Sequence, residues 1–201
     1  LWRDNFGPEL GFARSVGPAL GDEQVVLCKV ARSGANLYYD WNPDGVSRGT
    51  EDEYRGPLYP ELMRKIQTLA GLLNREGEPF ECAGMLWMQG ERDSVFEFMA
   101  EAYEENLVRF MGSVRRDVET DGLPFLIGQI APRSYLLRER RFRHGFRKIV
   151  QDAQKRVGKS VDGAVLVNST DLSQSDNLHF DTGGQMELGE RFARAYVSMM
   201  S

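Results

Sequence analysis

Residues 83–93 read AGMLWMQGERD, a short apolar run over 83–87 that passes directly into a polar loop containing a glycine. Three more apolar runs occur at 25–31 (VVLCKVA), 124–130 (PFLIGQI) and 164–167 (AVLV). Continuous apolar runs of this length, bounded by turn residues, are typical of strands that are buried on both faces. The four runs therefore predict a parallel sheet.

Helical periodicity fills the segments between these runs. Pro60 stands at an expected first helical position, and its helix is predicted to end near Gly77. A long amphipathic segment has apolar positions from 98 to 114, and a very basic helix is expected over about 136–157. A last helix is expected after a capping box formed by Thr182 and Gln185. Strands that alternate with helices predict an α/β class with three layers, α/β/α, around a central parallel sheet.

The composition excludes several classes of function. The chain has 201 residues, which is typical of a single domain, and 25 Lys+Arg stand against 30 Asp+Glu. A net charge of −5 argues against a nucleic-acid or anionic-membrane partner. No run of about 18 apolar residues could span a membrane. Cys28 and Cys82 lack the spacing of metal ligands and are expected to be buried free thiols, which leaves the cellular location open.

Polar loops follow each predicted strand. In open parallel sheets, sites form just beyond the carboxyl ends of the strands. Those positions are occupied by 32–36, 88–93, 129–133 and 168–181. We therefore expect the functional residues in these four loops.

A catalytic imidazole has only two candidates. His144 lies among cations, which oppose its protonation, and is expected on a solvated helix face. His179 lies in the last loop, with Asp176 three residues upstream. A carboxylate at this spacing can fix the tautomer of the ring and stabilise the imidazolium. A helix cap or a simple surface position is the alternative interpretation of this pair.

The loop after the second strand supplies complementary groups. The amide of Gln89 and the permissive backbone of Gly90 can direct N–H donors at a developing oxyanion. Glu91 or Asp93 could orient a histidine. Alternatively, Asp93 and Ser94 cap the helix that follows.

The residues over 87–93 resemble the W-H-Q-G-E-S-D block of the SGNH (GDSL-like) hydrolases. The nearest branch is that of sialate O-acetylesterases and acetylxylan esterases, carbohydrate esterase family six. Residues 6–13 resemble its F-G-P-E segment, 29–41 its second block, and 176–181 with 189–193 its terminal D-x-x-H block and closing helix. The resemblance covers nearly the whole chain and implies the flavodoxin-like SGNH fold.

This resemblance implies roles for individual residues. A serine attacks an acetyl ester, His179 is the general base, Asp176 orients it, and Glu91 is a second carboxylate near the histidine. The resemblance also implies that Gln89, the backbone N–H of Gly34 and Asn36 contact the oxyanion or the substrate. The family needs neither a metal nor an organic cofactor. Two departures, Met88 in place of His and 33–35 (SGA) in place of G-G-T, affect the pocket lining more than the proton relay.

The chain departs further from the family pattern in its nucleophile segment. The family's serine lies in a G-Q-S-N segment after a first strand and before F-G-P-E, whereas here F-G-P-E begins at residue 6 and no G-Q-S-N occurs. We expect residues 1–201 to form one SGNH-type esterase domain without its first strand and nucleophile segment. That segment is expected in the protein outside this chain, as a cleaved, truncated or separate N-terminal fragment.

Two further motifs have simpler interpretations. Ser47 stands in G-V-S-R-G at 45–49, but turn residues precede it and no apolar helix face follows, as a nucleophile elbow would need. A solvated loop serine is the better interpretation. The arginine-rich stretch 138–148 is expected to be a solvated helix face, with contact to an acidic sugar as the alternative.

The predicted function is that of a serine esterase that removes acetyl groups from carbohydrate esters, of acetylxylan or O-acetyl sialic acid type. The rival is a non-catalytic carbohydrate-binding member that has lost its serine. A flavodoxin-like nucleotide binder is disfavoured, because no glycine-rich phosphate loop follows a predicted strand.

Overall fold

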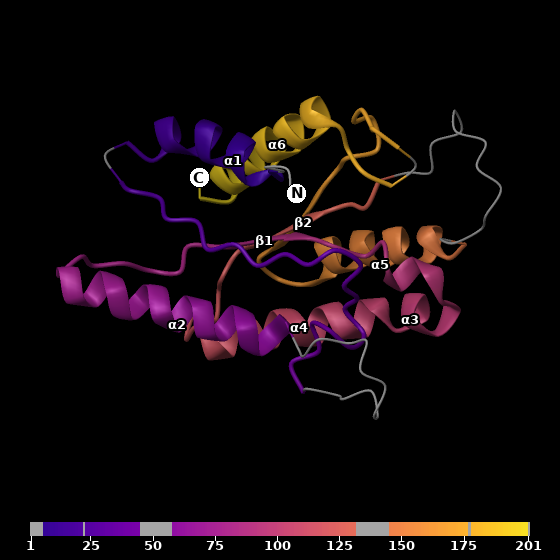
Figure 1. Cartoon of the computed structure of the whole chain (residues 1–201), viewed down its shortest axis with the longest axis horizontal. Helices are drawn as coiled ribbons and strands as arrows, with labels where there is room; N and C mark the ends of the chain where they lie inside the picture. The colour runs from indigo at the N-terminus through magenta and orange to yellow at the C-terminus, as the bar shows by residue number, and fades with distance from the viewer. Residues whose placement is uncertain (1–5, 22, 45–57, 132–144, 177, 201) are drawn as a thin grey trace, which may run out of the picture.

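The computed structural model describes residues 6–21, 23–44, 58–131, 145–176 and 178–200 (Figure 1). The helices are α1 (Glu9–Val16), α2 (Leu58–Glu76), α3 (Glu97–Glu101), α4 (Tyr103–Asp117), α5 (Arg147–Ser160) and α6 (Thr182–Met200), with short 3-10 turns η1 (Gly17–Ala19) and η2 (Asp93–Val95). The strands are β1 (Met85–Met88), β2 (Phe125–Gly128) and β3 (Ala164–Val167). None of the described helices is long and apolar enough to cross a membrane.

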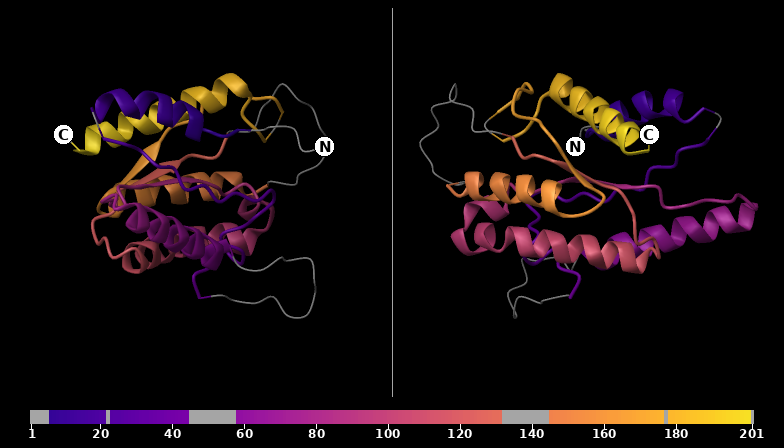
Figure 2. Two further views of the ribbon diagram at one scale, coloured as in Figure 1. Left: turned by 60° about the vertical axis from the view of Figure 1, so that its left-hand side comes forward. Right: turned by 180° about the vertical axis from the view of Figure 1, so that it is seen from behind.

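The described strands form a parallel three-stranded sheet in the order β1-β2-β3. Helices α1 and α6 cover one face, and α2, α3, α4 and α5 lie on the other (Figures 1 and 2). The predicted α/β class and the parallel sheet are confirmed. The register pairs Leu86 with Leu126 and Leu126 with Val165, so the three strands end together at one edge.

Side chains alternate between two cores along the central strand. Phe125 and Ile127 belong to the core under α2, α4 and α5, whereas Leu126 belongs to the core under α1 and α6. All three side chains are fully buried, as expected of a strand with helices on both faces. This two-sided burial explains why the sequence of β2 is a continuous apolar run.

Two glycines hold α1 against α6. A Cβ at Gly189 would overlap the carbonyl of Pro8 and the amide nitrogen of Phe12, and a Cβ at Gly11 would overlap the carbonyl of Met186. Only glycine permits backbones to approach this closely. The F-G-P-E segment is thereby packed on the last helix.

The predicted strand at 25–31 is wrong. The chain over residues 23–30 is extended but forms no strand, and Val25, Val26 and Leu27 are 40%, 54% and 40% exposed. A strand requires a backbone partner as well as a suitable sequence, and no backbone–backbone hydrogen bond joins residues 25–31 to another described residue. Cys28 is likewise exposed, so only Cys82 approaches the predicted burial, and both thiols are free.

Two helices begin at other residues than the sequence predicts. The basic helix expected from 136 begins at Arg147 after a turn at 145–146, and 132–144 lie outside the described residues. The helix containing Pro60 already includes Leu58. Its predicted end is confirmed, because Gly77 has a φ of +74° and ends the helix.

The predicted capping box at the start of α6 is also displaced. Asp181 accepts the N–H of Gly184 at 2.8 Å, so Asp181 is the cap and Thr182 is the first helical residue. An aspartate was overlooked one position upstream because the box pattern favoured Thr182 with Gln185.

Candidate active site

The carboxyl ends of the three strands meet at one edge of the sheet. Gln89 follows β1, Gln129 follows β2 and Asn168 follows β3. The loops that begin there carry most of the predicted site residues (Figure 1). The candidate active site therefore lies where parallel-sheet proteins normally place theirs.

The histidine and its aspartate are paired. Nδ1 of His179 lies 2.8 Å from Oδ2 of Asp176. The other carboxylate oxygen of Asp176 accepts the backbone N–H groups of Leu178 at 2.7 Å and of His179 at 2.6 Å. Burial raises the pKa of Asp176, but the hydrogen bonds from His179 and Leu178 outweigh it, and the pKa is lowered. An ionised carboxylate thus holds the ring with Nδ1 as the donor and leaves Nε2 to accept a proton.

The loop around this pair is held by its own backbone. The N–H of Ser175 donates to the carbonyl of His179 at 3.0 Å, and Gln174 pairs with Phe180 in an isolated antiparallel bridge. The hydroxyl of Ser173 donates to Asp181 at 2.6 Å. These contacts close a small hairpin on the N-terminus of α6, with His179 exposed near its tip.

Glu91 is partly buried and lies within electrostatic range of the histidine. Burial raises its pKa, whereas the charges of Arg147 and His179 lower it, and the net result is a raised pKa. Arg147 is itself only 8% exposed and stands at the start of α5. Loops from β1 and β3 thus bring a second carboxylate toward the ring.

Asp93 ties two loops together and is fully buried. Its carboxylate accepts the N–H of Leu37 at 2.9 Å and the side-chain amide of Gln89 at 2.6 Å. Burial outweighs these hydrogen bonds and raises the pKa of Asp93 to about 6. The amide of Gln89 also donates to the carbonyl of Ala35 at 3.1 Å. Both of its N–H bonds therefore have acceptors, and its oxyanion role stays a prediction.

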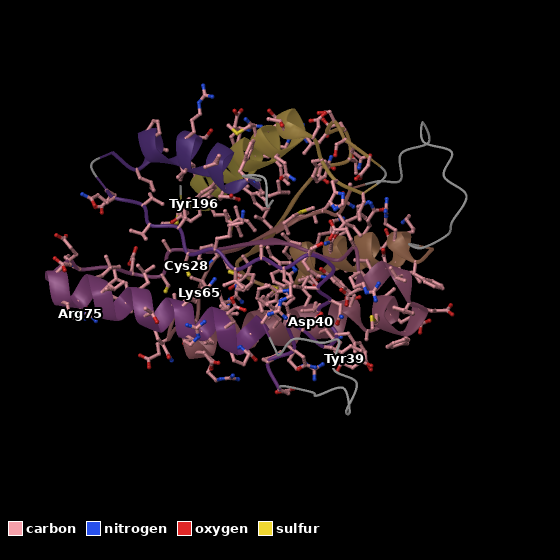
Figure 3. The ribbon with its side chains drawn as sticks, in the orientation of Figure 1. Cys28, Tyr39, Asp40, Lys65, Arg75 and Tyr196 are labelled. Atoms are coloured by element: carbon pink, nitrogen blue, oxygen red, sulfur yellow. The ribbon has the colours of Figure 1, made fainter. Side chains whose placement is uncertain are left out.

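The two other predicted substrate contacts differ in exposure. Gly34 is exposed and has a φ of +71°, which suits a tight turn. Asn36 is fully buried, its Nδ2 donates to Asp40 at 2.9 Å, and its Oδ1 accepts the N–H of Tyr39 at 2.6 Å. Asn36 therefore supports this turn, and its substrate contact stays a prediction. Figure 3 shows Tyr39 and Asp40 in the helical layer that contains α3 and α4.

Sequence reasoning missed Gln154, which is fully buried on α5. Its Nε2 donates to the carbonyl of Gln89 at 3.0 Å, and its Oε1 accepts the N–H of Ile130 at 3.1 Å. The hydroxyl of Tyr103 donates to the same carbonyl at 2.7 Å. Gln154 thus joins the ends of β1 and β2. Its position between Val150 and Val157 on an apolar helix face was the signal that could have identified it.

Several predicted residues lie outside the described part of the chain, among them Ser47, His144 and the arginines from 133 to 143. Within the described part, the ring of His179 has Asp176 as its hydrogen-bond partner, and no serine hydroxyl donates to it. The described residues likewise contain no group of three or more His, Cys, Asp or Glu that could hold a metal ion.

A three-layer α/β/α fold with a histidine–aspartate pair after the last described strand is that of the SGNH-type hydrolases. More narrowly, the chain belongs to the carbohydrate esterases described as sialic acid-specific acetylesterases, because the model of that family matches residues 3–198. The resemblance found in the sequence blocks is confirmed.

Individual relatives agree with this assignment. A probable carbohydrate esterase of Arabidopsis thaliana is 28% identical in an alignment of 198 positions that covers 96% of this chain and 64% of that relative. An X-ray structure of an Arabidopsis thaliana protein superposes with a TM-score of 0.61 at 27% identity, covering 82% of this chain and 57% of the other. A carbohydrate acetylesterase from Xanthomonas citri shares the fold, with a TM-score of 0.57 at 17% identity over 84% of this chain and 36% of the other.

Proposed function

We propose that this chain belongs to a serine esterase that removes acetyl groups from carbohydrate esters through an acyl-enzyme. The observation that carries the proposal is the 2.8 Å contact between His179 and Asp176 at the carboxyl edge of the sheet. A histidine oriented by a carboxylate is the base of acyl-transfer enzymes. Membership of a carbohydrate esterase family supports the choice of an acetylated sugar as substrate.

The reaction proceeds in two halves. A serine hydroxyl attacks the acetyl carbonyl while Nε2 of His179 takes its proton, and the charge of Asp176 stabilises the imidazolium. The tetrahedral intermediate then breaks its bond to the sugar oxygen, which takes the proton from His179 and leaves as a hydroxyl. Water then repeats the sequence, again with His179 as the base, and releases acetate. Glu91 supports the imidazolium from the opposite loop.

The serine is supplied, in this proposal, from outside the described residues, by a separate N-terminal fragment or an upstream segment of the same protein. Two buried amide atoms at the carboxyl edge support an added segment or ligand. Oε1 of Gln89 and Nε2 of Gln129 have no hydrogen-bond partner among the described residues. Buried polar atoms are normally paired, so these two are suited to contact a further polar group.

The test is labelling of the full-length protein with a serine-reactive fluorophosphonate, followed by intact-mass measurement and peptide mapping. One label on a serine of a segment upstream of residue 1, abolished in His179→Ala, is the expected result. Label on Ser47 would place the nucleophile in the G-V-S-R-G motif. A folded protein that takes up no label would instead be a carbohydrate-binding member without catalytic serine.

The substrate is tested separately. Acetate release from acetylated xylan oligosaccharides is compared with release from O-acetylated sialic acid. Faster turnover of the second would favour the sialic acid type, and faster turnover of the first would favour the acetylxylan type. Release from neither, by a protein that hydrolyses a simple aryl acetate, would exclude both substrate classes and retain the esterase.

A further inference from the structure

Arg191 on α6 makes a set of contacts that the proposed mechanism does not use. Its Nη1 and Nη2 donate to the two carboxylate oxygens of Asp171 at 2.6 and 2.7 Å. Nη1 also donates to the carbonyl of Asn168 at 3.0 Å, and Nε donates to Glu187 at 3.0 Å. A bidentate arginine–carboxylate pair of this kind fixes the relative orientation of the two side chains as well as their distance.

These partners lie at the start of the loop that carries the histidine. Asn168 is the first residue after β3, and Asp171 lies between it and Asp176. The returning side of the same loop is fixed by Asp181, which caps α6. The outgoing side is fixed to α6 by Arg191. Both sides of the loop are thus attached to one helix, one at its start and one in its middle.

We propose that Arg191 is a positioning residue that places the His179–Asp176 pair relative to Glu91 and the sheet edge. The inference rests on the proposed function, because it concerns the same catalytic pair. The pair itself is local and needs no help from Arg191. Ser169, which is buried and donates to the carbonyl of Gln129, and the core residue Leu172 also hold the outgoing side, so loss of Arg191 should shift the hairpin without freeing it.

The expected sizes of the effects on stability and on rate distinguish a positioning role from a merely structural one. The side chains of Arg191 and Asp171 are 22% and 63% exposed, and ion pairs this close to solvent contribute little to stability. A displacement of about 1 Å at a catalytic group, by contrast, can cost roughly 10²-fold in rate. Loss of Arg191 should therefore reduce kcat far more than it reduces stability.

The same helix supplies a matched control. Arg194 lies one turn away, is 61% exposed, and pairs with Glu187 at 2.9 Å and with Glu190 at 3.8 Å. Both partners are on α6, and no described residue of the histidine loop contacts it. Arg191→Gln and Arg194→Gln therefore remove the same charge from the same helix, but only the first breaks a contact between the helix and the loop.

The experiment measures aryl acetate hydrolysis by the full-length protein and its variants. Arg191→Gln should lower kcat on the order of 10²-fold with KM nearly unchanged, while Arg194→Gln retains the kcat of the wild type. Asp171→Asn, which weakens the same pair from its exposed partner, should reproduce the loss. Arg191→Lys should not restore kcat, because one ammonium cannot form the fork.

A second readout reports position without requiring catalysis. The pKa of Glu91, followed by carboxyl ¹³C NMR, should rise when His179 is replaced by alanine, because the charge of His179 lowers it. In a double-mutant cycle this rise should persist in the Arg194→Gln background and shrink in the Arg191→Gln background.

Retention of both kcat and the full Glu91 response in Arg191→Gln would overturn the inference, as would equal losses in Arg194→Gln. A wild-type protein that hydrolyses no ester refutes the proposed function, yet the Glu91 cycle still decides whether Arg191 places the pair. If Arg191→Gln fails to fold, the same comparison is made with Asp171→Asn.

Discussion

The carboxylate of Asp93 accepts the backbone N–H of Leu37 at 2.9 Å, although the two residues are 56 positions apart in the chain. The contact binds the turn that begins at Gly34 to the loop that carries Glu91. It also buries an ionisable group completely, which raises the pKa of Asp93 to about 6. A structural tie at the site edge is therefore sensitive to pH.

The first prediction concerns that sensitivity. The pKa of Asp93 is about 6 in the folded protein, above the value of about 3.9 for an unfolded chain, so the folded state binds the proton more tightly. The contribution of Asp93 to the free energy of unfolding should fall as the pH rises between about 4 and 6. Urea unfolding of the wild type and Asp93→Asn at several pH values tests this. A difference between them that does not vary with pH would contradict the assignment.

The second prediction concerns Gln89. Removing its amide takes one donor from the carboxylate of Asp93, which keeps the N–H of Leu37, and takes the side-chain donor from the carbonyl of Ala35, so Gln89→Ala should lower the free energy of unfolding by about 1–3 kcal/mol. If Gln89 also stabilises the oxyanion, kcat should fall roughly 10²–10³-fold. Unaltered turnover would remove Gln89 from the catalytic group, whatever happens to stability.

The third prediction concerns the base. His179→Ala should lower turnover by several orders of magnitude with the fold intact, and Asp176→Asn should cost about 10⁴-fold because it disturbs the tautomer. His144→Ala is the control, since the sequence places His144 among cations and away from the D-x-x-H block. Comparable losses in His144→Ala would show that the other histidine is the base.

The fourth prediction concerns the contact between α1 and α6. Gly189→Ala introduces a Cβ that overlaps the backbone of Pro8 and Phe12, and should destabilise the protein by about 1–3 kcal/mol. Gly112→Ala on α4 is the matched control, because nothing lies within 4 Å of a Cβ there. That change should stabilise the protein by about 0.5–1 kcal/mol. Equal effects on thermal unfolding would show that the helices are not in close contact.

The sequence predicts a strand correctly where helices cover both of its faces. The apolar runs that became β2 and β3 are read correctly because both faces of each strand pack against helices. The run at 25–31 has the same composition but lacks a backbone partner among the described residues. Composition reports a tendency to be buried, whereas strand formation depends on a neighbour that a single run does not reveal.

In the candidate site, too, contacts between residues near in sequence can be predicted, whereas contacts between distant elements cannot. Asp176 and His179 are three positions apart, so their pairing can be predicted from spacing alone. Asn36 has a suitable side chain in a suitable loop, yet its polar atoms bond to the turn around it. Arg191 and Gln154 act across elements that meet only in the folded chain. Their roles follow from tertiary contacts, which residue type and spacing do not contain.

The short span of the histidine–aspartate pair has a consequence for genome surveys. The pair forms within four consecutive positions and does not depend on the nucleophile. A protein that loses its catalytic serine can therefore keep the pair without any change in structure. We therefore expect intact D-x-x-H blocks to persist in inactive descendants long after activity has gone. Surveys that count esterases by this block will overestimate them, and a count that also requires an intact nucleophile segment will not.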